Sequence, residues 1–317
     1  MSERTYPKVT IVGAGNVGAT TALFTLMHNL ADVVLIDVAE GLPQGKALDM
    51  MHARSVEHFG PTVCGTNDYA DTAGSDVVVI TAGVARKPGM TREELVAINT
   101  DIVRSVVDKV VAASPEALIL CVTNPLDVMT YLAYKQSGLD HRRVLGMGGV
   151  LDSARFAFAV AEATDADICD IDACAIGAHG DAMTPMSAHT TICGKPITEL
   201  LTPDEVDALV ERTVFGGAEV VGLLKTGSAF VAPAASVTQM VRALLSDEET
   251  TLFSCVYLNG EYGISDIYLS VPARISNAGV VGIDELALCE VDLLRLRESA
   301  AITAASLDEL SLRTSAS

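Results

Sequence analysis

The feature that most constrains the fold is an alternation, in the first half of the chain, of short apolar runs with helical patterns. Such continuously apolar runs, rich in Val and Ile, are typical of parallel strands that are covered on both faces. The stretches between them predict helices, most clearly over 91–114, where Thr91 and Glu94 form a capping-box pattern and Pro115 follows. The order strand, helix, strand predicts an α/β fold with a doubly wound parallel sheet. The five runs are KVTIVG (8–13), VVLIDV (33–38), VVVITA (77–82), ALILCVT (117–123) and RVLGMG (143–148).

The pattern changes after about residue 150. A helical pattern over 151–166 leads to short mixed strands, in which Gly194-Lys195 and Asn259-Gly260 predict hairpin turns. A long helical stretch follows over 203–246, with a break between Gly227 and Pro233, and another helix closes the chain from about residue 284. We therefore expect two domains, residues 1–150 and residues 151–317, the second of the α+β class.

The composition excludes several classes of function. The 317-residue chain has a formal net charge of −20, which argues against binding to nucleic acid or to an anionic membrane surface. It has no apolar run long enough to cross a membrane and no signal-peptide pattern at its N-terminus, so we expect a cytoplasmic protein. The seven cysteines include no CxxC pair, and we expect them to be reduced core residues, with no metal site.

A glycine-rich segment follows the first apolar run and opens a helical pattern. Gly13 would permit a tight turn, Gly15 the close approach of backbone amides to a pyrophosphate, and Gly18 close packing of the helix on the strand. The N-terminus of the helix would offer unpaired N–H groups to the phosphates. This context predicts a Rossmann dinucleotide site formed by Gly13, Ala14, Gly15, Asn16, Val17 and Gly18.

Asp37 lies at the end of the second apolar run, 19 residues after Gly18. A carboxylate there accepts hydrogen bonds from the adenosine ribose hydroxyls and repels a 2′-phosphate, so the expected cofactor is NAD rather than NADP. The structural alternative is a glycine-rich turn beside an ordinary strand-end aspartate.

Three residues further along the chain suit hydride transfer at a hydroxyl-bearing carbon. His179 lies between glycines in GAHGD, and a histidine that titrates near neutrality can take the alcohol proton. Asp152 and Arg155, three apart in LDSARF, would share one face of a helix. Asp152 would then fix the tautomer of the histidine, and Arg155 would hold a carboxylate through two parallel hydrogen bonds.

Two other segments complete this set. Asn124 follows a predicted strand, at the sheet edge where ligands bind in such folds. The loop TAGVARKPGMTREEL (81–95) carries Arg86 and Arg92, cations that could enclose an anion and polarise a carbonyl. Each residue alone has an ordinary explanation, as a turn residue, a helix-terminal carboxylate, an ion-pair arginine or a structural histidine. Their joint occurrence after a dinucleotide motif favours catalysis.

Over nearly its whole length the sequence resembles the lactate/malate dehydrogenase family. The resemblance rests on GAGNVGAT, IDVAEGLPQGKALDM, TAGVARKPGMTREELVAIN, VTNPLDVMTYLA, MGGVLDSARF, GAHGD, TGSAFVAPAAS and YLNGEYG. It implies a Rossmann NAD-binding domain over 1–150, an α+β substrate domain over 151–317, and a mobile loop that closes over the substrate.

The resemblance also implies a role for each residue of the site. His179 would be the proton acceptor and Asp152 its partner, while Arg155 would bind the C1 carboxylate of the substrate. Arg92 would polarise the reacting carbonyl, and Asn124 would contact both substrate and nicotinamide. The cofactor site would further be lined by Asn99, Val122 and Thr123.

Arg86 stands at the position from which the resemblance implies the substrate. Lactate enzymes of this family typically carry Gln there, facing a methyl group, and malate enzymes carry Arg, facing a second carboxylate. We therefore expect reversible, NAD-dependent oxidation of (S)-malate, a small dicarboxylate, to oxaloacetate. The nearest branch would be the lactate-dehydrogenase-like malate enzymes, assembled as a homotetramer or homodimer. The alternatives are a lactate or other 2-hydroxyacid dehydrogenase and a non-catalytic NAD-binding sensor.

Overall fold

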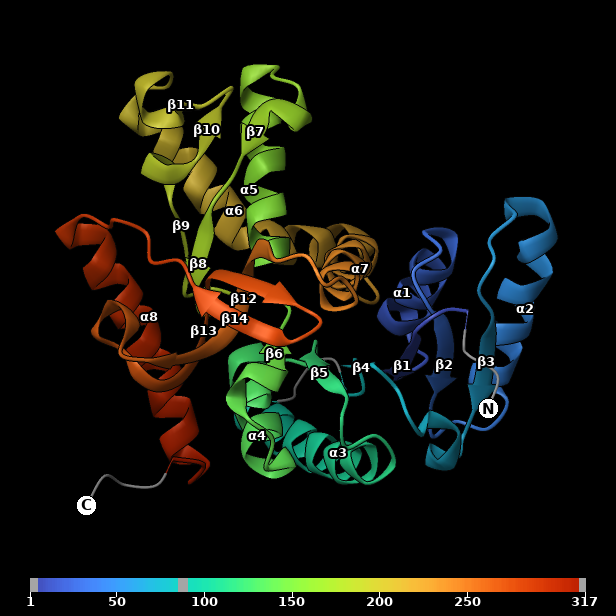
Figure 1. Ribbon diagram of the computed structural model, residues 1–317. Coiled ribbons are helices and arrows are strands. Elements are labelled where there is room, and N and C mark those ends of the chain that lie inside the picture. The colour runs from blue at the N-terminus through green and yellow to red at the C-terminus, as the bar shows by residue number, and fades with distance from the viewer. Residues whose placement is uncertain (1–4, 85–90, 314–317) are drawn as a thin grey trace. The chain divides into compact units, whose positions relative to one another are not determined.

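The computed structural model describes residues 5–84 and 91–313, and it divides into two compact units that interleave along the sequence (Figure 1). The sequence predicted one boundary, at residue 150, whereas the segments 230–250 and 275–281 pack with the first unit; no local pattern in the sequence marks these returns. The first unit comprises Met1–Met147, Phe230–Thr250 and Ile275–Val281, and the second comprises Gly148–Ala229, Thr251–Arg274 and Gly282–Ser317.

The first unit is built on a parallel sheet with the strand order β3-β2-β1-β4-β5-β6. All five strands that the sequence predicted are present. The edge strand β3 was not predicted because its sequence, VCGT, is short, contains a glycine and is buried only at its two ends. The strands are β1 (Lys8–Val12), β2 (Asp32–Ile36), β3 (Val63–Thr66), β4 (Val77–Ile80), β5 (Leu118–Cys121) and β6 (Val144–Gly146).

The strand order explains how the helices of the first unit cover the sheet. From β1 the chain first moves outward through β2 to β3, and it then returns to the other side of β1 and moves outward through β4, β5 and β6. Right-handed crossovers place the helices of the two halves on opposite faces, so the sheet is doubly wound as predicted. The helices are α1 (Asn16–Met27), α2 (Leu42–Glu57), α3 (Arg92–Ala113), α4 (Leu126–Ser137) and α7 (Val231–Leu244).

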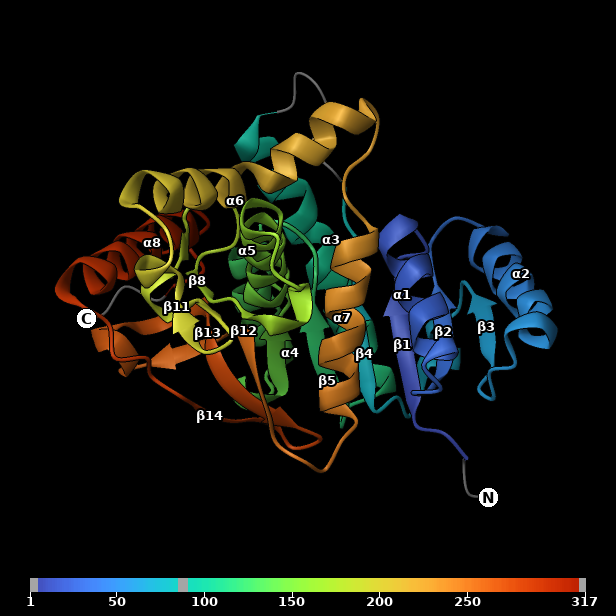
Figure 2. The ribbon, with the colours of Figure 1, turned by 90° about the horizontal axis from the view of Figure 1, so that it is seen from above.

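Contacts within the unit agree with this arrangement. Helix α7 comes from a segment far along the chain and packs against α1, while α3 packs against α4 (Figure 2). The predicted capping box of α3 is confirmed. The Glu94 amide donates to Thr91 Oγ1 over 3.1 Å, and the Thr91 amide donates to Glu94 Oε2 over 2.9 Å.

The second unit combines antiparallel strands with three long helices, which confirms the predicted α+β class. Strand β8 pairs antiparallel with β9 and with β13, and β10 pairs with β7 and β11 in a small separate sheet. The helices are α5 (Gly149–Thr164), α6 (Pro203–Leu224) and α8 (Glu290–Glu309). The strands are β7 (Ile171–Asp172), β8 (Ala175–Gly177), β9 (Met183–Pro185), β10 (Thr191–Ile192), β11 (Lys195–Pro196), β12 (Thr250–Asn259), β13 (Ser265–Ser276) and β14 (Gly279–Ile283), the last three of which begin or end in the first unit.

The core beneath α5 fixes the position of that helix. Phe156 and Val160 are fully buried on one face of α5, where they pack with Ile171, Ile197 and Leu209. Burying a side chain of this size stabilises the fold by about 1.5–3 kcal/mol. This packing holds α5 in place and with it the polar residues near the start of the helix.

Several local predictions for the second half need correction. The helical stretch 203–246 is broken as predicted, between Leu224 and Val231, but the closing helix starts at Glu290 rather than near 284. The predicted hairpin at Gly194 exists, with Cys193 and Gly194 as its turn residues, at φ 49° and 76°. The connection after Asn259 is wider than a two-residue turn, because a short 3₁₀ turn over Glu261–Gly263 precedes β13. Within the described ranges, no helix has both the length and the apolar composition needed to cross a membrane.

The prediction that the cysteines are core residues is right for only three of them. Cys121, Cys174 and Cys255 are buried, and burial raises the pKa of the Cys121 and Cys174 thiols to about 12, so these two stay protonated near neutral pH. The other four lie on an edge strand, in turns or at a helix start, where a small side chain needs no burial. These exposed free cysteines are Cys64, Cys169, Cys193 and Cys289.

Candidate active site

The glycine-rich turn between β1 and α1 has the geometry of a phosphate-binding turn. Gly13 has a φ of +109°, and a Cβ added there would lie 2.6 Å from Thr81 Oγ1. A Cβ on Gly18 would lie 1.9 Å from the Gly13 carbonyl oxygen, so helix and strand approach each other as closely as predicted. Gly15 has no heavy atom within 4 Å of an added Cβ, which leaves open space over the turn. The three glycines therefore suit the three roles that the sequence suggested.

Asp37 follows β2 and supports this turn directly. Its Oδ2 accepts a hydrogen bond from the Ala14 amide at 2.7 Å, and its Oδ1 accepts one from the Ala39 amide at 2.9 Å. From α2, Lys46 donates its Nζ to the Ala14 carbonyl over 2.7 Å. Sequence reasoning did not single out Lys46, although it stands in the segment GKALDM that contributed to the resemblance. The turn is thus held by one anion and one cation from neighbouring elements.

The start of α1 can receive an anion. Its N-cap is Gly15, which has no side chain to bond the first-turn amides, and that turn contains no acidic residue. Asn16 is exposed, Val17 is half-buried and Ala14 is buried. The predicted dinucleotide residues therefore lie together at the carboxyl end of β1, beside β2 and β4, where the strand order reverses.

The ends of β4 and β5 are joined by Asn99. Its Nδ2 donates to the Asn124 carbonyl over 2.7 Å, and its Oδ1 accepts from the Val84 amide at 2.8 Å. Thr123 Oγ1 donates to the Ala82 carbonyl over 2.7 Å. Asn99 is only 1 % exposed, so its amide serves to hold these two strand ends. Beside them Asn124 is exposed and Val122 is half-buried.

His179, Asp152 and Arg155 form one connected set inside the second unit. His179 Nδ1 lies 2.9 Å from Asp152 Oδ2, and Arg155 Nη1 donates to Asp152 Oδ1 over 3.3 Å. The Asp152 side chain is 2 % exposed, against 13 % for His179 and 20 % for Arg155. The two oxygens of this buried carboxylate thus have one partner each, His179 and Arg155. The predicted shared face of α5 brings Asp152 and Arg155 together.

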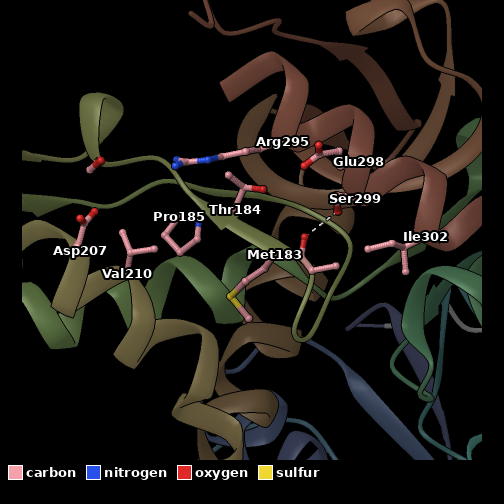
Figure 3. A pocket seen from close by; sticks show the side chains of 11 residues that line it. Met183, Thr184, Pro185, Asp207, Val210, Arg295, Glu298, Ser299 and Ile302 are labelled. Atoms are coloured by element: carbon pink, nitrogen blue, oxygen red, sulfur yellow. Dashed lines mark hydrogen bonds between the residues drawn. The ribbon is translucent and has the colours of Figure 1, made fainter. Parts of the chain in front are cut away.

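The turn that carries His179 runs from β8 to β9. Gly177 and Gly180 have φ values of +92° and +106°, and the Met183 amide donates to the Gly180 carbonyl over 3.0 Å. On its outer side the turn borders a pocket of about 290 Å³ between β9, α6 and α8. Figure 3 shows Met183, Thr184 and Ser299 among the side chains of this pocket. Ser299 was not singled out by sequence reasoning, since it stands in an ordinary helical stretch.

The side chains of the two arginines in the predicted loop lie outside the described part of the structure. Arg86 lies outside the described residues, and Arg92 is the first residue of α3. Their roles stay predictions from the sequence. The structure thus assembles predicted residues at three places: the glycine turn with Asp37, the strand ends held by Asn99, and the His179 set.

Two family models match nearly the whole chain. The model of the lactate/malate dehydrogenase NAD-binding domain matches residues 7–146, and that of the lactate/malate dehydrogenase alpha/beta C-terminal domain matches residues 149–311. The chain belongs to the lactate/malate dehydrogenase family. It is accordingly an NAD-dependent oxidoreductase, with the Rossmann-type sheet in its NAD-binding part.

Relatives from several organisms fit this membership. Malate dehydrogenase of Pelodictyon phaeoclathratiforme is 51% identical over 93% of this chain and 96% of its own length. That of a Roseiflexus species is 46% identical over 96% of this chain and 98% of its own length.

Solved structures of the family show the same fold. Malate dehydrogenase of Salinibacter ruber has a TM-score of 0.92 at 42% identity and covers 96% of this chain and 97% of its own. Lactate dehydrogenase of Cryptosporidium parvum, solved with lactic acid and nicotinamide adenine dinucleotide, has a TM-score of 0.94 at 39% identity and covers 98% of this chain and 100% of its own. The fold alone therefore does not separate the two substrates.

Proposed function

We propose that this protein catalyses the reversible, NAD-dependent oxidation of (S)-malate to oxaloacetate, with His179 as the proton acceptor. The observation that carries the proposal is the buried Asp152 carboxylate, which contacts both His179 and Arg155. Such a set supplies a base and an anion-binding cation side by side. The sequence relatives that are named malate dehydrogenases support the dicarboxylate as substrate.

The Asp152 contact determines which nitrogen of His179 acts. An ionised carboxylate only accepts hydrogen bonds, so Nδ1 of the neutral imidazole carries the proton toward Asp152. The lone pair is then on Nε2, which takes the C2 hydroxyl proton as the hydride leaves C2 for the nicotinamide. Asp152 stabilises the imidazolium that forms, and the same proton returns to the substrate in the reverse reaction.

Arg155 is proposed to bind the C1 carboxylate of the substrate. One of its five N–H donors is directed at Asp152, which fixes the orientation of the guanidinium plane. Its side chain also lies along Gly216 and Gly217 of α6, where an added Cβ would be 3.5 Å and 3.4 Å from it. Glycines at these positions let α6 pack closely along the Arg155 side chain, and the donors not directed at Asp152 remain to bind an anion.

Arg86 is proposed to select the dicarboxylate. A second arginine would neutralise the distal carboxylate of malate or oxaloacetate. Against pyruvate it would stay desolvated without a partner, at a cost of about several kcal/mol. Arg92 is proposed to polarise the reacting carbonyl, and Asn124 to contact substrate and nicotinamide. These assignments rest on the positions of the residues in the family pattern.

NAD is bound, on this proposal, by the glycine turn and Asp37. Each Asp37 oxygen accepts one backbone amide and has a second lone pair, which leaves the capacity to accept from the ribose hydroxyls. The first-turn amides of α1 would bind the pyrophosphate over Gly15. Ala14, Asn16, Val17, Asn99, Val122 and Thr123 are proposed to complete the surroundings of the cofactor.

The assembly and the location are also proposals. We propose a homotetramer or homodimer in the cytoplasm. Support for self-association comes from large apolar side chains exposed on α2, among them Leu48 at 58% and Val56 at 72% exposure, which contact with a second chain would cover. Light scattering of the purified protein measures the assembly directly, and a monomer at all concentrations would contradict it.

The decisive experiment measures NADH oxidation by the purified protein with oxaloacetate and with pyruvate in parallel. We expect a strong preference for oxaloacetate with NADH, and little activity with NADPH. The lactate alternative has support from the lactate dehydrogenases among the structural neighbours, and a preference for pyruvate would establish it. Binding of NADH with no turnover of either acid would instead indicate the sensor alternative.

The Arg86→Gln variant tests the selectivity within the same assay. We expect kcat/KM for oxaloacetate to fall by about a hundredfold or more and that for pyruvate to rise, since a paired charge is lost and a desolvated one is removed. Undiminished turnover of oxaloacetate by this variant would show that Arg86 has another role.

A further inference from the structure

A serine on the last helix bonds both sides of the turn that carries His179. Ser299 of α8 is 3 % exposed. Its Oγ accepts a hydrogen bond from the Ala178 amide at 2.7 Å and donates to the Ala182 carbonyl over 2.7 Å. Figure 3 shows the second bond as a dashed line. One hydroxyl therefore satisfies a backbone donor on one side of His179 and a backbone acceptor on the other.

The fit between this serine and the turn is close. A Cβ added to Gly177 would lie 2.9 Å from Ser299 Oγ and 3.4 Å from Ser299 Cβ. Gly177 also has a φ of +92°, which side chains rarely adopt. The backbone that leads into His179 thus packs directly on the serine, and the turn cannot move toward α8 without displacing it.

A second buried serine, on α5, bonds the strand that leads into the His179 turn. Ser153 Oγ of α5 accepts from the Ala175 amide at 3.0 Å, and Ser153 is the neighbour of Asp152 in sequence. The α5 contact therefore holds β8 at Ala175, and the α8 contact holds the chain at Ala178, directly after β8 ends. Both contacts hold the backbone that leads to His179, whose Nδ1 lies 2.9 Å from Asp152 Oδ2.

We propose that Ser299 is a positioning residue for the reaction, which keeps the His179 turn in the conformation that places Nδ1 on Asp152 and directs Nε2 to the substrate hydroxyl. It acts through the backbone of Ala178 and Ala182. The proposal rests on the proposed role of His179 as proton acceptor. Misplacement of a reacting group by about 1 Å can reduce a rate by about a hundredfold, so loss of this clamp should be visible in the chemical step.

The test compares Ser299→Ala with wild type. We expect kcat to fall by about tenfold or more, with a smaller change in KM for the keto acid and an unchanged Kd for NADH measured by fluorescence. The deuterium isotope effect on kcat, measured with NADH deuterated at the transferred position, should rise because hydride transfer becomes slower. Ser299→Thr keeps the hydroxyl and should recover most of the rate.

Ser306→Ala is the matched control on the same helix. Its hydroxyl donates over 3.2 Å to the Ile302 carbonyl, within α8, so this variant should keep the wild-type kcat. Two outcomes would each overturn the proposal: a Ser299→Ala kcat within about twofold of wild type, or a reduced kcat with an unchanged isotope effect. Should Ser299→Ala fail to fold, Ser299→Cys, with its weaker donor and acceptor, takes its place in the comparison.

The same assays separate this proposal from the proposed function. Each variant is measured on whichever of oxaloacetate and pyruvate the wild type reduces faster. A wild type that prefers pyruvate would overturn the malate assignment and leave the Ser299 comparison intact. Full turnover by His179→Asn would overturn the role of His179, whatever Ser299→Ala does.

Discussion

Two glycine-flanked turns carry the chemistry of this protein, and they are stabilised in different ways. The turn after β1 is held by Asp37, Lys46 and Thr81, all of which follow it within the first 81 residues. The turn after β8 is held by Ser299, whose bond to Ala178 spans 121 residues of chain. The glycines of the first turn stand close together in the sequence and can be recognised as a motif, whereas the support of the second turn becomes visible only in three dimensions.

The two turns also differ in what they offer a ligand. The glycine turn presents backbone amides at the start of a helix, which suits a phosphate. The histidine turn presents a base that is oriented by a buried carboxylate. Variants of the glycine turn should therefore weaken NADH binding, and variants of the histidine turn should slow turnover.

The largest effect is expected from His179→Asn. Loss of the base should lower kcat by about a thousandfold, since general base catalysis contributes about 10²–10⁴. Because His179 belongs to the second turn, NADH affinity should stay at the wild-type level, as measured by the quench or enhancement of NADH fluorescence. Parallel loss of NADH binding and turnover would mean that the histidine is structural and that the two turns do not serve binding and turnover separately.

Gly18→Ala should produce the opposite pattern. The added Cβ would lie 1.9 Å from the Gly13 carbonyl, so the helix must move away from the strand. We expect a loss of about 2–4 kcal/mol in the free energy of unfolding and weaker NADH binding, measured by urea denaturation and fluorescence titration.

Gly15→Ala is the matched control for that prediction. An added Cβ at Gly15 meets no heavy atom within 4 Å, so stability should change little, while approach of the pyrophosphate should be hindered. Equal stability of the two variants would show that packing between helix and strand is not the constraint at Gly18.

A smaller effect is expected at Asp37. In Asp37→Ser, the preference for NADH over NADPH should fall by about tenfold to a hundredfold, because the charge that repels a 2′-phosphate is removed. The control is Asp32→Ser at the start of β2, the strand that Asp37 follows; the Asp32 carboxylate accepts from the Thr62 amide at 2.7 Å. The ratio of kcat/KM for the two cofactors measures the effect, and an equal change in both variants would assign it to the strand rather than to the ribose contact.

The sequence predicted the structural features that depend on residues close together in the chain. The Val- and Ile-rich runs gave five parallel strands, and Thr91 with Glu94 gave the start of α3 within a residue. Three spaced residues, Asp152, Arg155 and His179, were expected to act together, and they lie in contact.

What the sequence did not predict depends on contacts between distant segments. Strand β3 is short and lies at the edge of the sheet beside β2, so its composition carries little signal. Helix α7 returns to pack against α1, and no local pattern marks that return. Lys46 and Ser299 look like ordinary helical residues until the fold places them against the backbone of a turn.

The smallest expected effect concerns the second capping box, at the start of α6. The Thr202 amide and hydroxyl donate to Glu205 over 2.8 Å each, and these bonds lower the pKa of the Glu205 carboxyl below its ordinary value of 4.5. A carboxyl whose pKa is lower in the folded than in the unfolded chain stabilises the fold above its unfolded pKa, and this contribution is lost as pH falls through the folded pKa. Glu205 is fully exposed, so the effect is screened by solvent and small.

Glu205→Gln should therefore lower the urea midpoint slightly at about pH 7 and leave it unchanged below the folded pKa of Glu205, where the wild-type carboxyl is also protonated. Asp204→Asn removes one charge from the same helical turn without breaking the box, and it controls for the interaction with the helix dipole. If both variants shift the midpoint equally at neutral pH, the charge alone matters. A difference that persists below the folded pKa of Glu205 would assign the effect to the hydrogen-bond geometry of the box rather than to the ionised carboxylate.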